Sequence, residues 1–193
     1  MSFNKKHYLP IAAVAGATAI AVASLMAYKA RSERQQVDFI TGFYKSYLGE
    51  TRRAPPSAGT FYSPELEDLL ATNHELCRKL ARSNEICGYD ADGDVFLNAQ
   101  ETASGLNLGT AGFKAVYSGN GTVDVSFNVF PGQGGNYQRK IRFVLTMEDA
   151  GWRVDDMRFG ANTLRRDVQH ENETLLARTR TSSGTTTRAA APP

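Results

Sequence analysis

A short acidic stretch, Tyr89 to Glu101, has the residue types and the spacing that metal chemistry requires. It reads YDADGDVFLNAQE, with three aspartates at alternate positions and a glutamate eleven positions after the first of them. An EF-hand loop takes its calcium ligands from the first, third, fifth and twelfth positions, among others. The stretch therefore raises the hypothesis of a calcium site, with ligands Asp90, Asp92, Asp94 and Glu101.

Two features of this stretch depart from an EF-hand. Val95 occupies the sixth position, where the loop needs a left-handed residue, and a branched Cβ is strained in that conformation. The segment that follows Glu101, TASGLNLG, is poor in helix formers, so the second flanking helix is missing. A looser calcium turn that uses only Asp90, Asp92 and Asp94 remains open, and apart from such weakly bound calcium no cofactor is expected.

The interpretation that the sequence favours is a structural clasp between a helix and a sheet. Aspartates in turns accept hydrogen bonds from nearby backbone N–H groups, and Gly93 supplies an unusual backbone dihedral. In that case Asp90, Asp92, Asp94 and Glu101 hold backbone in place, and no metal is needed.

Cys77 and Cys87 are the two cysteines of the chain. In an exported domain they can form a disulfide, whereas in a cytoplasmic domain they are expected as buried thiols. Closing a loop of about ten residues would stabilise the fold by roughly 3 kcal/mol in the chain-entropy model. A zinc site is not expected, because two cysteines and three scattered histidines offer no ligand quartet.

Catalytic patterns are weak, and the chain is predicted not to be an enzyme. His74 with Asp90 or Glu101 is a conceivable acid–base pair, but a histidine on a helix is more often a packed residue. No Ser-His-Asp set, nucleophile elbow or phosphate loop occurs. Asp155 and Asp156 are adjacent in a predicted strand, so without a bulge they point to opposite faces.

Two amphipathic helices are expected to support these residues. In VDFITGFYKSYLGE, apolar residues repeat at three and four positions, which predicts a helix that ends near Gly49. A second helix begins at Ser63 and Pro64, with the serine as N-cap and the proline in the first turn, and it carries Cys77.

A run of strands follows the second helix. From Phe113 onward apolar residues alternate with polar ones, and SGNG, PGQGGN and EDAG separate the alternating runs. Short turns make neighbouring strands antiparallel, and one apolar face implies a sheet covered on one side. Helices followed by an antiparallel meander predict an α+β fold.

The longest uncharged run, Tyr8 to Tyr28, predicts a transmembrane helix. Its 21 residues would rise about 31 Å, which matches the hydrocarbon core of a bilayer. A retained signal anchor is favoured over a cleaved secretory signal at Ala21-Val22-Ala23, because the run continues through Leu25 and Met26. The short N-terminus is expected in the cytoplasm and the body outside it.

The chain is expected to divide into three parts. Residues 1–34 hold the short tail, the anchor and a linker, residues 35–160 the α+β domain, and residues 161–193 a short helix and a tail disordered from Arg178 onward. With 22 basic and 20 acidic residues and no basic cluster in the body, nucleic acid is not an expected partner.

Two segments, GYDADGDVFLNAQE and GWRVDDMRF, resemble an uncharacterised family of small bacterial envelope proteins. Members are periplasmic or lipid-anchored, and their domain is similar to the NTF2-like or cystatin-like cone. The resemblance covers Val37 to Phe159 and implies two helices packed on a curved antiparallel sheet. The family usually has proline and aspartate where this chain has Val95 and Glu101.

The resemblance also implies roles for the acidic stretch. Phe96 and Leu97 would anchor the turn in the core, and Gln100 and Glu101 would tie down neighbouring backbone. No enzymatic role carries over from the family, and some relatives act as accessory partners of other envelope proteins.

The predicted function is a non-enzymatic, membrane-anchored interaction module in the periplasm, held on the bacterial inner membrane. A cleaved, soluble periplasmic form is the alternative. Its partner would be another envelope protein, and the contacts are predicted on the long strand, where exposed aromatic and arginine side chains make good anchors. The residues are Tyr137, Gln138, Lys140 and Arg142, which would otherwise form a solvated face.

Three other functions remain open. Assembly factors of some secretion machines also combine a short tail, one span and an NTF2-like periplasmic domain. An immunity protein would bind one secreted toxin tightly. A small-ligand or enzymatic cone would need a deep pocket that holds His74 and a carboxylate.

Overall fold

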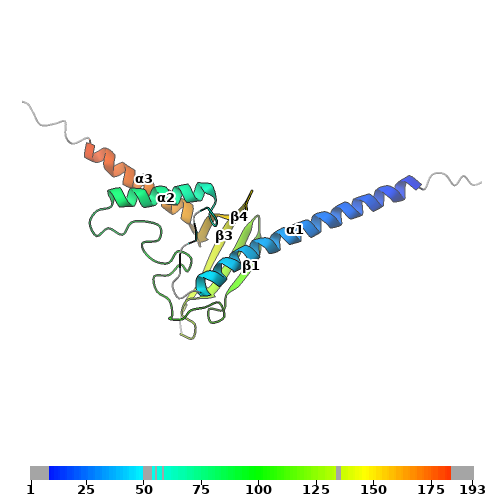
Figure 1. The fold of residues 1–193 in the computed structure, drawn as a ribbon, viewed down its shortest axis with the longest axis horizontal. Coiled ribbons are helices and arrows are strands. Elements are labelled where there is room, and N and C mark those ends of the chain that lie inside the picture. The colour runs from blue at the N-terminus through cyan, green and yellow to red at the C-terminus, as the bar shows by residue number, and fades with distance from the viewer. Residues whose placement is uncertain (1–8, 50–53, 55, 58, 134–135, 184–193) are drawn as a thin grey trace, which may run out of the picture.

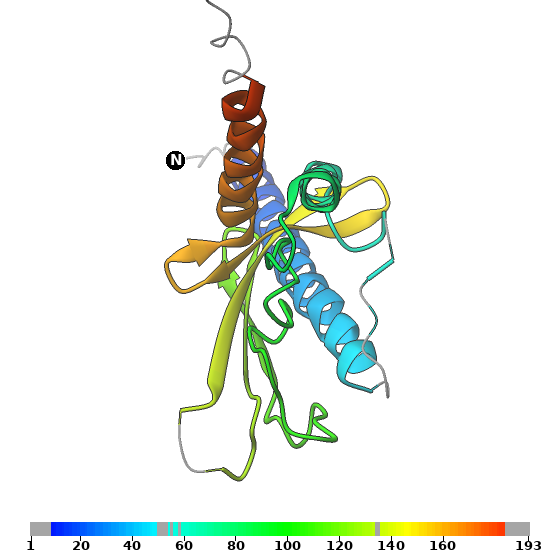
Figure 2. The same cartoon turned by 90° about the vertical axis from the view of Figure 1, so that its left-hand side faces the viewer.

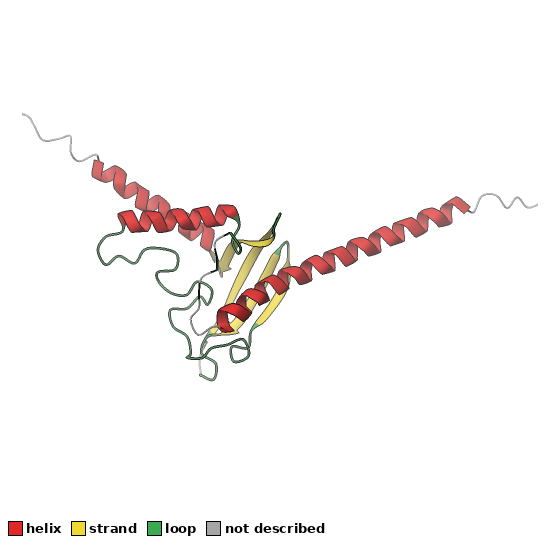
Figure 3. Ribbon diagram, in the orientation of Figure 1, coloured by secondary structure: helices red, strands yellow, loops and turns green. Residues whose placement is uncertain are grey.

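The computed structural model describes residues 9–49, 54, 56–57, 59–133 and 136–183, with side chains between residues 24 and 178 of these ranges. Figures 1 and 3 show helices arranged around one antiparallel sheet. The helices are α1 (Leu9–Gly49), α2 (Pro64–Leu80) and α3 (Leu164–Ser183). The strands are β1 (Lys114–Gly119), β2 (Thr122–Asn128), β3 (Gln138–Glu148), β4 (Gly151–Phe159) and β5 (Asn162–Thr163).

The sheet confirms the predicted α+β class. Its strand order is β1-β2-β3-β4-β5, and every neighbouring pair is antiparallel. Val125 lies opposite Ile141, and Phe143 lies opposite Met157, so the buried residues line up across the strands. The alternation read from the sequence therefore places one apolar face toward the helices.

Helix α1 covers the part of the sheet formed by β1 and β2. Its buried residues are spaced four, four, three and one positions apart, which places them in one stripe. They are Gln36, Ile40, Tyr44, Tyr47 and Leu48. The N-terminal part of α1 extends away from the sheet in Figure 1.

The segment expected to link the anchor to the domain is helical, because α1 continues without a break through residues 31–36. The sequence there, RSERQQ, contains neither glycine nor proline, and most of its residues are good helix formers.

Among the residues whose side chains the structure describes, no helix has the length and apolar character to cross a membrane. Most of the predicted span from Tyr8 to Tyr28, with the alternative cleavage site, lies outside those residues. The span stays a prediction.

Helix α2 begins as predicted. The Ser63 side chain accepts a hydrogen bond from the Leu66 backbone N–H at 3.2 Å, and Pro64 is the first helical residue. Just before the helix, the chain pairs with β4, where Ser63 N donates to Val154 O at 2.8 Å and Val154 N donates to Phe61 O at 2.7 Å. This bridge holds the start of α2 against the sheet.

Helix α3 is longer than expected and overturns part of the predicted C-terminal division. The structure places 20 residues in it, through Ser183, whereas a short helix and disorder from Arg178 were predicted. Its buried positions are Leu164, Val168, Asn172 and Leu175. Asn172 interrupts the apolar pattern. A prediction based on hydrophobic residues therefore does not detect the second half of the helix.

Helices α2 and α3 pack against each other, and both contact β4. Figures 1 and 2 show them side by side at one end of the sheet, while the long loop between α2 and β1 runs below them. That loop, residues 81–113, contains the acidic stretch.

Candidate functional site

Asp94 is the centre of the acidic stretch. One carboxylate oxygen, Oδ1, accepts hydrogen bonds from the backbone N–H groups of Phe96 and Leu97 at 3.0 and 3.1 Å. The other, Oδ2, accepts a hydrogen bond from the Tyr47 hydroxyl at 2.8 Å, and the Tyr44 hydroxyl donates to the Phe96 carbonyl at 2.7 Å. Phe96 and Leu97 are buried in the core, which confirms the anchoring role implied for them.

Gly93 and Asn98 allow the chain to reverse within the stretch. Their φ angles are 144° and 46°, while Val95 has no positive φ. A Cβ on Gly93 would lie 2.9 Å from the Ala99 carbonyl oxygen, which is too close for any side chain. Asp94 and Ala99 form a small antiparallel bridge, with N···O distances of 2.9 and 3.3 Å.

The EF-hand hypothesis is wrong for this stretch. The residues with positive φ, Gly93 and Asn98, are at the fourth and ninth positions of the loop, not at the sixth. They flank the segment in which the chain turns back to form the bridge between Asp94 and Ala99. No helix follows Glu101 in the described segment up to β1.

The four predicted ligands do not converge. Asp90, Asp92 and Glu101 are exposed, and no three carboxylates of the set bring their oxygens within 4.8 Å of one another. Asp92 accepts a hydrogen bond from the Gln100 amide at 2.9 Å, so Gln100 contacts a side chain rather than the backbone expected for it. A weak calcium turn stays a prediction that would require exposed carboxylates to move toward Asp94.

Cys77 and Cys87 form a disulfide with a Cα–Cα distance of 5.5 Å, which confirms the predicted pairing. The bond joins α2 to the segment that leads into the acidic stretch. Glu171 lies near the two sulfurs, but disulfide sulfurs are not thiolate ligands, so this cluster is no metal site.

Asn73, which the sequence analysis missed, connects three elements. Its amide nitrogen donates to Glu171 Oε2 at 2.7 Å and to Asn172 Oδ1 at 2.9 Å, both on α3. Its amide oxygen accepts a hydrogen bond from the Tyr89 backbone N–H at 3.1 Å. Glu171 also accepts one from the Gly88 N–H at 3.3 Å, so α2, α3 and the start of the stretch are held together.

A signal for this connection exists in the sequence. The inward positions of α2 are Leu66, Leu70, Asn73 and Cys77, and those of α3 are Leu164, Val168, Asn172 and Leu175. Each helix has one asparagine on its apolar stripe, and buried amides are almost always hydrogen-bonded. Two such residues on two helices indicate a pair across the interface.

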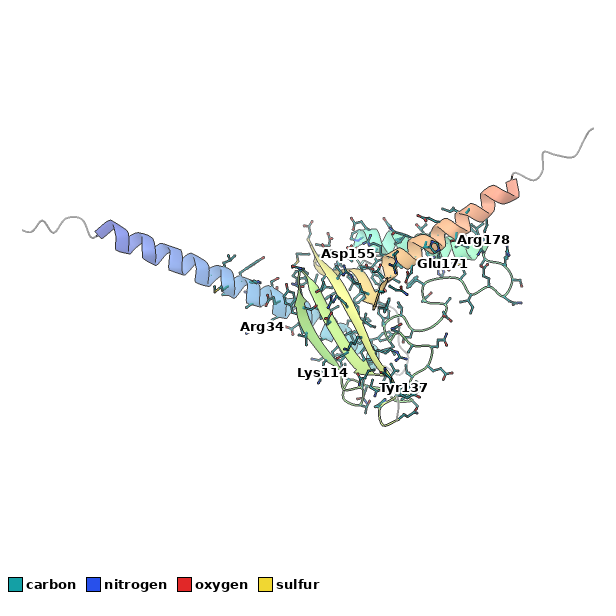
Figure 4. All side chains as sticks on the ribbon, turned by 180° about the vertical axis from the view of Figure 1, so that it is seen from behind. Arg34, Lys114, Tyr137, Asp155, Glu171 and Arg178 are labelled. Atoms are coloured by element: carbon teal, nitrogen blue, oxygen red, sulfur yellow. A yellow bond between two sulfur atoms is a disulfide. The ribbon has the colours of Figure 1, made fainter. Side chains whose placement is uncertain are left out.

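An open groove of about 860 Å³ lies beside the stretch. Four segments contribute to its lining: the stretch itself, the chain around the β2–β3 connection, the β4–β5 turn and the first turns of α3. Tyr137 and Glu171 both line the groove. Figure 4 shows Tyr137 at the lower end of the sheet and Glu171 on α3.

Aromatic rings and carboxylates dominate the lining. The rings are Tyr89, Phe130, Tyr137 and Phe159, and the carboxylates are Asp92, Asp94, Glu101, Asp167 and Glu171. Arg139 is the single basic residue in the described lining, and its guanidinium donates to the Asn98 carbonyl at 2.9 Å. Burial, and secondarily the Asp90 carboxylate, raise the pKa of Tyr89, so its hydroxyl remains protonated in neutral solution.

The four predicted contact residues, three on β3 and Tyr137 directly before it, do not share one face. Gln138, Lys140 and Arg142 are exposed on the outer face of the sheet, whereas Tyr137 is half-buried, lines the groove and packs against Phe130 with ring centroids 5.0 Å apart. Grouping Tyr137 with the others was wrong, because successive strand residues point to opposite sides.

Arg142 has a partner within the sheet. Its guanidinium donates two hydrogen bonds to the Asp124 carboxylate, at 2.6 and 2.8 Å. The arginine holds the pKa of that carboxyl below its ordinary value.

His74 is exposed on α2 and is not part of the groove lining. The inward position next to it belongs to Asn73. The acid–base pair considered for an enzymatic cone therefore has no histidine in this groove.

Asp155 and Asp156 do not point apart as expected. Asp155 accepts hydrogen bonds from Ser63 Oγ at 2.8 Å and from the Arg165 guanidinium at 2.5 Å, and Asp156 accepts one from the Arg165 backbone N–H at 3.0 Å. An irregularity opposite Val144 and Leu145 breaks the alternation. Both carboxylates then hold the starts of α2 and α3.

Comparison with family models gives no match, and comparison with curated proteins gives none. Among solved structures, the chain is similar to a protein of unknown function from Bacteroides thetaiotaomicron, with 17% identity, a TM-score of 0.47 and coverage of 71% of this chain and 98% of that one. This likeness carries no argument about function, and the NTF2-like or cystatin-like resemblance stays a prediction.

Proposed function

We propose that this protein is a non-enzymatic, membrane-anchored interaction module of the bacterial envelope, with an NTF2-like or cystatin-like domain in the periplasm. The groove beside the acidic stretch would hold a segment of another envelope protein. The observation that carries this proposal is the open groove of about 860 Å³, lined by four aromatic rings on a hydrogen-bonded scaffold.

Three observations support the location. The uncharged run from Tyr8 to Tyr28 has the length of a membrane span. Leu25, Met26 and Tyr28, on the projecting part of α1, are each more than three-fifths exposed, so they need a cover that the domain does not provide. The disulfide suits an oxidising compartment.

The groove is a better docking site than the outer face of the sheet. Binding sites are concave and combine apolar walls with a few polar groups, as this groove does. On the outer face, Arg142 already has an ion-pair partner in Asp124, which leaves Gln138 and Lys140 as the exposed residues of the predicted set for which no such pair is described. That face is the second candidate surface.

A small-ligand cone is the second candidate function, because the volume of the groove lies within the range of small-molecule pockets. An assembly factor or an immunity protein would differ from the proposed module in the identity of its partner. In either case the partner would bind in the same groove.

The first experiment tests location. A compartment-sensitive reporter should be fused after Ser183, because α3 packs on α2 and β4 and a fusion after Phe159 would remove it. We expect periplasmic reporter activity and, in intact cells, no labelling of Cys77 or Cys87 by thiol reagents. A cytosolic reporter would reject the proposed location.

The second experiment tests the surface. A photo-crosslinking amino acid is placed in the full chain at Glu101, on the groove, or at Lys140, on the outer face; both positions are exposed. We expect a discrete adduct in cells from position 101 and none from position 140. Adducts from Lys140 alone would move the site to the outer face, and none from either would reject the interaction module.

A further inference from the structure

We infer that the groove takes an extended peptide segment whose arginine or lysine side chains enter it. This inference rests on the proposed function, since it names the chemistry of the partner at the same groove. It is carried by the combination of an acidic lining with aromatic walls in one concave site.

The charge of the groove differs in sign from that of the chain. The chain as a whole has a formal charge of +2, while the described lining has five carboxylates and one guanidinium. The excess of carboxylates is therefore a local property of the groove lining, and it favours cationic ligands on a protein that is otherwise slightly basic.

Two of the carboxylates are placed to meet a ligand. Glu101, on the loop, and Asp167, in the first turn of α3, are both exposed and line the groove from different elements. Asp167 has an exposed ion pair with Arg166 at 3.6 Å, which contributes little and can be exchanged for a ligand cation. The two carboxylates therefore offer a cationic ligand ion-pair partners on two different elements.

The aromatic lining selects the kind of cation. Tyr89, Phe130, Tyr137 and Phe159 all contribute to the lining, and aromatic rings interact favourably with guanidinium or ammonium groups and with their aliphatic stems. These rings would not serve as ligands of a metal ion. In addition, no three carboxylates of the described groove have oxygens within 4.8 Å of one another. An anionic ligand would be repelled.

The open shape favours a peptide over a compact ligand. The lining includes residues from the loop, from the ends of β2 and β3, from the β4–β5 turn and from α3, so a bound chain can lie along several elements and place successive side chains. An enclosed small cation would use one part of this surface.

The test measures binding of defined probes to the full chain in lipid nanodiscs, by fluorescence anisotropy. The probes are three nine-residue peptides. The first consists of three Ser-Gly-Arg repeats, and the other two have citrulline or glutamate in place of each arginine. Tetramethylammonium is the small-cation probe. We expect saturable binding of the arginine peptide, weaker binding at higher salt, and no binding of the glutamate peptide.

Matched double variants locate the site. Glu101→Gln with Asp167→Asn removes two charges from the groove, and Glu148→Gln with Asp149→Asn removes two at the opposite end of β3 from Tyr137. The first is expected to weaken binding of the arginine peptide about fivefold, and the second to leave it unchanged. Thermal unfolding of each variant confirms that it is folded.

Several outcomes would overturn the inference. They are equal binding of the citrulline and arginine peptides, equal losses in the two double variants, and absence of peptide binding with retained binding of tetramethylammonium. Self-association of the chain that is lost in the groove variant would assign the groove to a second copy and overturn the inference as well.

The inference and the proposed function fail separately. A groove crosslink at position 101 without binding of the arginine peptide would leave the interaction module intact and reject the cationic partner. Binding of the arginine peptide with a cytosolic reporter would keep the cationic partner and reject the envelope location.

Discussion

Neighbouring residues on α2 illustrate how far residue type alone predicts a role. His74 has chemistry to offer and is exposed, while Asn73 is fully buried and holds α3 and the loop. Likewise, Asp94 is engaged by Tyr47 and by backbone, although Asp92, two positions before it, is exposed and contacts Gln100. At this scale burial and hydrogen-bond partners decide the role of a residue.

The first prediction concerns Asn73. Asn73→Ala should lower the free energy of unfolding by about 2–3 kcal/mol, because it leaves the Tyr89 N–H and the side chain of Asn172 without their partner. His74→Ala, the matched control, should change it by less than about 0.5 kcal/mol. Urea denaturation measures both, and equal effects would contradict the role of Asn73.

The second prediction separates the clasp from a calcium site. Asp94→Asn should destabilise the protein by about 1–2 kcal/mol, because asparagine has one acceptor oxygen, whereas both carboxylate oxygens of Asp94 accept hydrogen bonds. Asp92→Asn should have an effect below about 0.5 kcal/mol.

Calcium is the control in this comparison. Calorimetry and thermal unfolding of the unmodified protein should show no heat of binding and no shift on addition of calcium. A saturable heat that Asp92→Asn abolishes would establish the weak calcium turn and refute a purely structural stretch.

At the scale of elements, the loop between α2 and β1 is held from several sides. The disulfide and Asn73 connect it to α2, Tyr44 and Tyr47 connect it to α1, and Glu85 connects it to α3. A long irregular loop can form one wall of a groove because these contacts restrict it.

The third prediction addresses the disulfide. Replacing both Cys77 and Cys87 by serine should lower the free energy of unfolding by roughly 3 kcal/mol, since the open loop gains freedom in the unfolded chain. A reducing agent should destabilise the unmodified protein by a similar amount and leave the double variant unchanged. Equal stability of the two proteins under oxidising conditions would contradict this expectation.

The fourth prediction concerns the ion pair between Glu85 and Arg178, with an N···O distance of 2.7 Å. The hydrogen bond from Arg178 lowers the pKa of Glu85 to about 2, from an ordinary value near 4.5. Because the folded-state pKa is the lower one, the stabilisation is present above pH 4.5 and disappears as the pH falls from about 4.5 to about 2.

A comparison with Glu85→Gln isolates this pair, since Glu75 titrates in the same range and is unchanged in the variant. The difference in unfolding free energy between the two proteins should shrink as the pH falls through that window, and it should be smaller at high salt. A difference that does not vary with pH would show that the pair contributes nothing.

At the scale of the whole molecule, α1 and α3 leave the sheet in different directions, and α1 runs without interruption from its projecting part into the core. The same helix therefore contributes the predicted anchor and the tyrosines that hold the acidic stretch. If residues 8–28 lie in lipid, the continuous helix keeps the domain at a set distance from the membrane.

The fifth prediction tests this continuity. Spin labels on cysteines introduced at Met26 and Lys114 should give one narrow distance distribution in the full chain. Ser32→Pro should broaden it, because proline interrupts the helix outside the packed part, while Ser32→Ala should not. A distribution that is already broad before substitution would contradict a rigid connection.

Features that depend on local chemistry could be predicted from the residues alone. The alternation from Phe113 onward defined the strands, the Ser63-Pro64 pair defined the start of α2, and Cys77 and Cys87 had no other cysteine to pair with. These features follow from residues a few positions apart, or from the lack of alternatives.

The groove and the contacts that support it could not be predicted in this way, because they form between residues far apart in the chain. Asn73 meets Asn172 across 99 positions, Tyr44 meets Phe96 across 52, and Tyr137 lies on the groove side of β3 rather than with its neighbours. Such contacts depend on which faces of distant elements come together, and that is set by packing of the whole core rather than by any local pattern.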